Sequence, residues 1–169
     1  MRHLWLIGMM GSGKSEVGRR VAELTGFPFV DLDERVVANR GQSISEIFAG
    51  EGEIAFRRLE RDELRAAADE DPAVIATGGG VITGVGTSAL MRASGTVLYL
   101  AAEPATLAGR VGADSHRPLL TGGDRVDILT EILRLRAPLY EAAAHHTIDT
   151  ENHTIDEVAG EAIGLWNRS

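Results

Sequence analysis

The segment that most constrains the fold of this chain lies near its start, at residues 8–15, which read GMMGSGKS. This is the G-x-x-x-x-G-K-[ST] pattern of a phosphate-binding loop, whose backbone N–H groups close around phosphate oxygens at a helix N-terminus. The apolar residues 4–7 predict the strand that must precede such a loop, and apolar residues at helical spacing up to Gly26 predict the helix that must follow. We therefore expect the chain to bind a nucleotide; the alternative is a flexible glycine turn.

The loop also contains the only lysine of the chain, Lys14, because the other sixteen basic residues are all arginine. A compositional bias explains the arginines, but a compact ammonium and a planar guanidinium are not interchangeable in a phosphate loop. Lys14 is expected to reach the β- and γ-phosphates, and the Ser15 hydroxyl is expected to bind Mg²⁺. The predicted nucleotide contacts in this segment are Gly11, Ser12, Gly13, Lys14, Ser15 and Glu16.

Composition and charge narrow the class of protein. A chain of 169 residues with 44% apolar and 25% charged residues predicts one globular domain, residues 1–169. A net charge of −8 argues against binding to nucleic acid, and the absence of cysteine excludes disulfides and thiolate metal sites. With no signal peptide and no apolar stretch long enough to span a bilayer, we expect a cytoplasmic monomer without a membrane partner.

Strand and helix patterns alternate along the chain. Strands are predicted at residues 4–7, 27–31, 73–76 and 96–100, with a weak fifth at 147–149. Helices are predicted at residues 33–69, interrupted near Gly41 and residues 50–52, at 104–111, and at 125–143, where Pro138 is expected to kink or break the helix. This alternation predicts an α/β protein with a parallel sheet covered on both faces, which binds ligands at the carboxyl ends of its strands.

Two short motifs fall at those carboxyl ends. Asp31 and Asp33 end the second strand, where alternation would point both carboxylates into the crevice, one toward Mg²⁺ and one toward a substrate hydroxyl. The alternative is a polar turn with a helix cap. The third strand runs into residues 77–80, TGGG, without an acidic residue, so Asp31 is the nearest candidate for the metal. Glycines let a backbone approach a ligand closely, although a loose loop would also contain them.

Arginines at four positions are candidates for binding an anion. Arg57 and Arg58 diverge by about 100° on a helix, so one can face the cleft while the other faces water, unless both are surface charges. Arg136 continues an apolar helical stripe and needs a partner, which is either an anionic ligand or an internal carboxylate. Arg117 lies in a polar segment, about residues 112–124, that is either a lid over the phosphates or a solvated loop.

Taken together, these segments resemble the shikimate kinase family over nearly the whole chain. The resemblance rests on GMMGSGKS, the two aspartates, EIFAGEGEIAFRRLE, ATGGGVIT, RPLL and LRAPLY, in this order and spacing. It implies a three-layer P-loop kinase fold, that is, a five-stranded parallel sheet flanked by helices. It also implies a substrate-binding helical section at about residues 33–61 and a lid at about residues 112–124.

The resemblance further implies ATP-dependent phosphorylation of the 3-hydroxyl of shikimate, with Mg²⁺ as cofactor and ATP as co-substrate. Asp33, Lys14 and Arg117 are then the catalytic residues, and Arg110 lies near the adenine. Ser15 ligates Mg²⁺ with Asp31 behind it. The residues implied to hold shikimate are Asp33, Arg57, Gly78, Gly79, Gly80 and Arg136.

The sequence departs from the family pattern at three positions. Glu16 follows Ser15 where many members place Thr, Leu32 separates the aspartates where Thr is common, and His153 stands near the adenine where some members have Arg. These departures bear on nucleotide affinity. The alternatives are a kinase of another small polyol or sugar acid, and a non-catalytic nucleotide-binding module. A GTPase is excluded because its N-K-x-D signature needs a second lysine.

Overall fold

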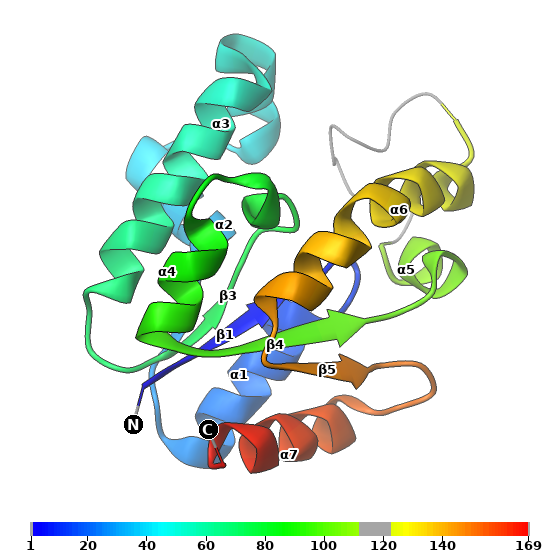
Figure 1. The fold of residues 1–169 in the computed structure, drawn as a ribbon. Coiled ribbons are helices and arrows are strands. Elements are labelled where there is room, and N and C mark those ends of the chain that lie inside the picture. Colours follow the sequence, from blue (N-terminus) through cyan, green and yellow to red (C-terminus); the bar gives the residue numbers. More distant parts are fainter. Residues whose placement is uncertain (1, 112–122, 169) are drawn as a thin grey trace.

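A computed structural model describes residues 2–111 and 123–168, and its centre is one parallel sheet. The five strands lie in the order β2-β3-β1-β4-β5, and every neighbouring pair is parallel (Figure 1). This arrangement confirms the predicted five-stranded α/β fold. The strands are β1 (His3–Ile7), β2 (Phe29–Asp31), β3 (Val74–Ala76), β4 (Gly95–Ala101) and β5 (His146–Asp149).

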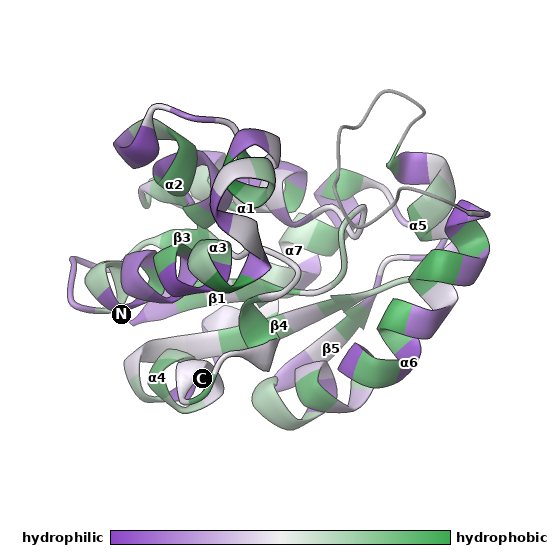
Figure 2. Ribbon diagram, turned by 90° about the horizontal axis from the view of Figure 1, so that it is seen from above, coloured by the Kyte–Doolittle hydropathy of each residue, from purple (hydrophilic) through white to green (hydrophobic). Residues whose placement is uncertain are grey.

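Seven α-helices and one 3₁₀ helix cover the described part of the sheet. They are α1 (Lys14–Thr25), α2 (Leu32–Arg40), α3 (Ile44–Ala68), η1 (Val81–Thr83), α4 (Thr87–Ser94), α5 (Pro104–Arg110), α6 (Arg125–Ala143) and α7 (Ile155–Trp166). Hydrophilic and hydrophobic residues alternate around the helices, as expected where one face is buried (Figure 2). None of the helices described is long and apolar enough to cross a membrane.

Strand β1 shows how the sequence produces three layers. All five of its residues are buried, and successive side chains point to opposite faces of the sheet. Leu4 and Leu6 pack against α1 and α7, while Trp5 and Ile7 pack against the core shared with α3, α4, α5 and α6. A strand buried on both faces reads as a continuous apolar run, which is what residues 4–7 display.

Helices α2 and α3 form a small subsection with its own core of Val36, Ile47 and Phe56. They lie on the opposite side of the molecule from α5 and α6 (Figures 1 and 2). Gly41 ends α2 in a left-handed conformation, and Gly52 is non-helical within α3, with φ 80° and ψ 172°. Both predicted interruptions are therefore confirmed.

The sequence predicted a kink or a break near Pro138, and the predicted break does not occur. Helix α6 runs without interruption through Pro138 to Ala143. Proline removes one backbone donor and so weakens a single turn. The helix persists because Leu129, before the proline, and Tyr140, after it, are both fully buried in the same core.

Candidate active site

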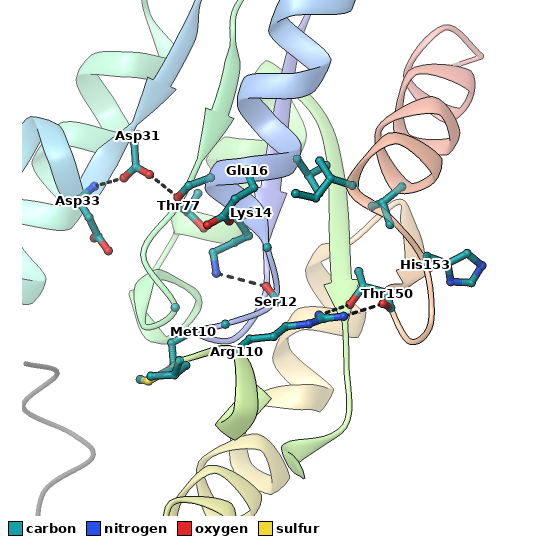
Figure 3. Close-up of a pocket in the computed structure, with 18 residues that line it drawn as sticks. Met10, Ser12, Lys14, Glu16, Asp31, Asp33, Thr77, Arg110, Thr150 and His153 are labelled. Carbon is teal, nitrogen blue, oxygen red and sulfur yellow. Dashed lines mark hydrogen bonds between the residues drawn. The ribbon is translucent and has the colours of Figure 1, made fainter. Parts of the chain in front are cut away.

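A cavity of about 510 Å³ lies at the carboxyl ends of the strands. The phosphate loop, the start of α1, the end of β2 and the loop after β3 form its walls (Figure 3). Gly8 has φ +146°, and a Cβ there would lie 2.5 Å from the carbonyl oxygen of Leu100. The loop can therefore pass this close to the backbone of β4 only with glycine at this position.

Lys14 is the first residue of α1, and it is buried, with 8% of its surface exposed. Its Nζ donates hydrogen bonds to the carbonyl oxygens of Gly8 and Met9, at 2.9 and 2.7 Å. It also lies 3.4 Å from the Ser12 hydroxyl (Figure 3). The ammonium is therefore held at the helix N-terminus, where backbone N–H groups already favour an anion.

Ser15 and Asp31 meet across the cavity wall. The Ser15 hydroxyl donates a hydrogen bond to Oδ2 of Asp31 at 2.6 Å. The other oxygen, Oδ1, accepts from the backbone N–H groups of Asp33 and Glu34, at 3.0 and 3.3 Å, so Asp31 caps the N-terminus of α2. One carboxylate thus joins the start of α1 to the start of α2.

The predicted geometry of Asp31 and Asp33 is corrected by this arrangement. The prediction placed both side chains on one strand face, but β2 ends at Asp31 and Asp33 lies in the first turn of α2. A helix cap was the alternative interpretation of these two aspartates. Asp33 still lines the cavity, because the helical turn, rather than strand alternation, carries its carboxylate toward the glycine loop (Figure 3).

Arg57 and Glu60 approach the cavity from α3. The Arg57 side chain is 21% exposed and forms ion pairs with Glu60 and, at 3.0 Å, with Glu53. Glu60 is 2% exposed, and burial raises its pKa to about 7, against the lowering effect of Arg57 and with a further increase from Asp33. Arg58 is exposed to solvent, as expected if Arg57 is the arginine that faces the cleft.

The glycine loop that follows β3 packs tightly against these side chains. A Cβ on Gly78 would lie 2.1 Å from Oε1 of Glu60 and 2.6 Å from Oδ1 of Asp33. A Cβ on Gly80 would lie 2.0 Å from Nη1 of Arg57. Real Cβ atoms do not make such contacts, so this is a packed surface and not a loose loop.

Helix α6 reaches the same loop through Arg136 and Tyr140. Nη1 of Arg136 donates to the carbonyl oxygen of Gly79 at 3.2 Å, and the Tyr140 hydroxyl donates to the same oxygen. Within the part of the chain described, Arg136 has no ion pair with a carboxylate, which the salt-bridge alternative required. Its guanidinium is half-buried and fixed by a neutral acceptor.

The far wall of the cavity contains Arg110 and His153. Nη1 and Nη2 of Arg110 donate to the hydroxyl and the carbonyl oxygen of Thr150, at 2.9 and 2.8 Å (Figure 3). Glu16 lies on the cavity edge and is exposed. Arg117 and nearly all of the predicted lid, residues 112–122, lie outside the described residues.

The structure brings most of the predicted site residues together. Those that line the cavity are Gly11, Ser12, Gly13, Lys14, Ser15, Glu16, Asp31, Asp33, Gly79, Arg110 and His153. Arg57, Gly78, Gly80 and Arg136 adjoin it through the contacts described above. Sequence reasoning missed the buried carboxylate of Glu60, although its position three residues after Arg57 on one helix face was a usable signal.

Comparisons with known proteins agree with this geometry. Residues 10–165 match the family model described as shikimate kinase. A shikimate kinase of Symbiobacterium thermophilum is 44% identical over 94% of this chain and 92% of its own length, and one of Caulobacter vibrioides is 46% identical over 94% and 78%. The structure of a shikimate kinase from Acinetobacter baumannii in complex with shikimate matches with a TM-score of 0.95 and 35% identity, over 98% of this chain and 92% of that one.

A more distant solved structure shares the fold alone. Deoxyadenosine kinase from M. mycoides with bound dATP has a TM-score of 0.64 at 12% identity, over 98% of this chain and 99% of that one. The family model covers more than nine-tenths of the sequence, and the two relatives named above exceed 40% identity over 94% of this chain. This chain therefore belongs to the shikimate kinase family.

Proposed function

We infer that this protein is a shikimate kinase, which transfers the γ-phosphoryl group of ATP to the 3-hydroxyl of shikimate and yields shikimate 3-phosphate and ADP. The observation that carries this inference is that Lys14 of the phosphate loop and Asp33 of α2 line one continuous cavity. A phosphate donor and a hydroxyl acceptor bound in that cavity are close enough to react without a covalent enzyme intermediate. Phosphoryl transfer needs mainly positioning and charge stabilisation.

In this proposal the nucleotide occupies the half of the cavity formed by the phosphate loop. The loop N–H groups and Lys14 hold the β- and γ-phosphates at the N-terminus of α1. Arg110 and His153 lie on the opposite wall, toward the adenine. Arg117, in the proposed lid at about residues 112–124, contacts ATP.

The acceptor occupies the other half, against the glycine loop and the α2–α3 section at about residues 33–61. Arg57 and Arg136 flank that loop from two different helices, which suits them to hold one carboxylate between them. Asp33 accepts a hydrogen bond from the reacting hydroxyl and orients it. Glu60 contacts Arg57 and acts as a positioning residue, because it holds the guanidinium in place.

Mg²⁺ fits the donor atoms at the start of α1. The Ser15 hydroxyl and the Asp31 carboxylate already lie 2.6 Å apart, and hard oxygen donors of this kind suit this ion. In the described ranges no three His, Asp or Glu side chains gather into a metal site. The proposed ion would accordingly take further ligands from the phosphates, and it would neutralise charge on the transferred group.

The experiment that tests the function measures ADP release with MgATP and a series of acceptors. We expect turnover with shikimate, and little with gluconate or with the same cyclohexene lacking the carboxylate. Asp33→Asn should abolish the shikimate-dependent rate while nucleotide binding persists, since only the acceptor contact is altered. Equal turnover with another polyol, or near-normal turnover in the Asp33 variant, would contradict the proposal. Gel filtration of the same preparation tests the expected monomer.

A further inference from the structure

A second cavity of about 450 Å³ lies at the amino ends of the strands, whereas the active site lies at their carboxyl ends. In Figure 1 this is the side on which the strands begin and on which both marked chain ends lie. None of the residues that line the active-site cavity lines this one. Its lining includes three arginines, two histidines and a tryptophan, which are Arg2, Arg92, Arg168, His145, His146 and Trp166.

Among the described residues, the side chains that line this amino-end cavity are neutral or basic. None of these lining residues is Asp or Glu, although the chain has 25 acidic residues and a net charge of −8. Elsewhere many arginines are paired with carboxylates, as Arg19 is with Glu34 and Arg35 with Glu63 and Glu70. Within residues 2–111 and 123–168, the three arginines of this cavity form no ion pair with a carboxylate.

Backbone carbonyls at helix ends hold two of these arginines in place. Arg2 donates to the carbonyl oxygen of Ala93 near the end of α4. Nη1 of Arg92 donates to the carbonyl oxygens of Ala143 and Ala144 at the end of α6, both at 3.0 Å. Carbonyl groups at helix C-termini attract cations, so these contacts restrict the side chains of Arg2 and Arg92. They do not supply a formal negative charge to balance the two guanidinium groups.

Capping of helix ends accounts for Arg2 and Arg92 individually, but it does not account for the convergence of further basic groups. Arg168, after the end of α7, and the pair His145–His146, at the start of β5, line the same cavity. Nδ1 of His145 accepts a hydrogen bond from the Val97 N–H at 3.0 Å, so the neutral ring carries its proton on Nε2. Nε2–H is therefore a donor that an anion can use.

The electrostatics of His145 are consistent with a positive local field. Its pKa is lowered, first by burial and then by the positive charges of Arg92 and His146. Arg2, before β1, and Arg168, after α7, line the same cavity. An anion bound among them would reverse this effect and raise the pKa of His145.

We propose that this amino-end cavity is a second binding site, specific for a small multivalent oxyanion such as a phosphate ester or a polycarboxylate. Its volume is in the range of metabolite-sized pockets, and guanidinium groups with restricted geometry recognise oxyanions well. The strongly acidic net charge disfavours an extended nucleic acid as the occupant. Because the cavity and the phosphate loop lie at opposite ends of the strands, the anion binds here without displacing a nucleotide.

The test exploits the two tryptophans of the chain as local reporters in ¹⁵N NMR spectra. The Trp166 indole N–H donates to the carbonyl oxygen of Arg2 at 3.1 Å, and the Trp5 indole N–H donates to the Ser94 hydroxyl at 3.1 Å. Pyrophosphate and citrate serve as probes, with saturating MgADP present to occupy the phosphate loop. We expect a saturable shift of the Trp166 indole signal, and a rise in the pKa of His145 measured from its ring carbon-bound protons.

Arg168→Gln should weaken pyrophosphate binding about tenfold, because a charge-assisted contact is lost. In the part of the chain that the structure describes, the Arg168 side chain forms no hydrogen bond to a helix end, so we expect this variant to fold as wild type does. Arg92→Gln is the second variant, and circular dichroism checks its fold. Arg134→Gln, an exposed arginine that pairs with Glu131 on α6, is the matched control and should bind as wild type does. A shift that never saturates, equal affinities in Arg168→Gln and Arg134→Gln, or loss of the shift when MgADP is added would each overturn the proposal.

Discussion

Half-buried Arg57 and buried Glu60, one turn apart on α3, form an ion pair directly beneath the glycine loop that follows β3. Glu60 is 2% exposed, and its Oε1 has no hydrogen-bond partner among the described residues. A buried carboxylate with only part of its hydrogen bonding satisfied is costly, and this cost is what raises its pKa to about 7. The buried Glu60 carboxylate thus lowers the stability of the fold, while it fixes the position of the Arg57 guanidinium.

The first prediction concerns the pH dependence of stability in Glu60→Gln. Because the folded-state pKa is raised from 4.5 to about 7, the folded chain keeps a proton that the unfolded chain has released. Wild-type stability therefore falls as the pH rises through this window, and the variant lacks this contribution. Relative to wild type, the variant should gain up to about 3 kcal/mol between pH 4.5 and pH 7.5. Urea unfolding at several pH values measures this difference, and parallel profiles for the two proteins would contradict it.

The second prediction compares two adjacent arginines. Arg57→Ala should raise the KM for shikimate by about 10- to 100-fold, because a charge-assisted contact to its carboxylate is lost. Arg58→Ala is the matched control and should change the KM little, since this side chain is exposed and diverges by about 100° on the helix. Arg136→Ala should resemble Arg57→Ala. Initial rates at varied shikimate concentration measure these effects, and equal effects at positions 57 and 58 would show that the wrong helix face was assigned.

How far the sequence predicts this site depends on the range of the interactions. The phosphate loop and the apolar run of β1 are local patterns, and each determines its own conformation. The aspartates show the limit, because strand alternation and a helix cap both fit Asp31 and Asp33. Only the packing of α2 after β2 decides in favour of the cap.

Helix α6 shows a second limit of local reasoning. Pro138 is a strong local signal against a continuous helix, but Tyr140 is fully buried and packs against Tyr99 on the sheet. Tertiary packing outweighs the lost hydrogen bond. The contacts of Gly80 with Arg57, and of Gly79 with Arg136, join segments far apart in the chain, so no window of sequence contains them.

The third prediction uses one of those long-range contacts. Gly80→Ala places a methyl group where the Arg57 guanidinium now lies, at 2.0 Å. The guanidinium is at the end of a flexible side chain, so we expect it to move away and the fold to survive. The KM for shikimate should rise about tenfold, with an unfolding midpoint close to that of wild type. Gly160→Ala in α7, where a Cβ meets nothing within 4 Å, is the control and should leave the KM unchanged. A wild-type KM in Gly80→Ala would show that Arg57 does not hold the substrate.

The last prediction concerns the single lysine and an amine-acylating reagent. Lys14 is 8% exposed, with Nζ bonded to two loop carbonyls, so it should react more slowly than the α-amino group of the same chain. Acylation should abolish turnover, since it removes the charge that the β- and γ-phosphates require. MgATP at ten times its Kd leaves about one-tenth of the sites open and should slow the labelling of Lys14 about tenfold. Shikimate alone should protect Lys14 less, because it binds beside the phosphates.

Peptide mapping by mass spectrometry follows both amines, with the α-amino group as internal control. Lys14 labelling at the same rate with and without saturating MgATP would contradict the placement of the nucleotide on the phosphate loop.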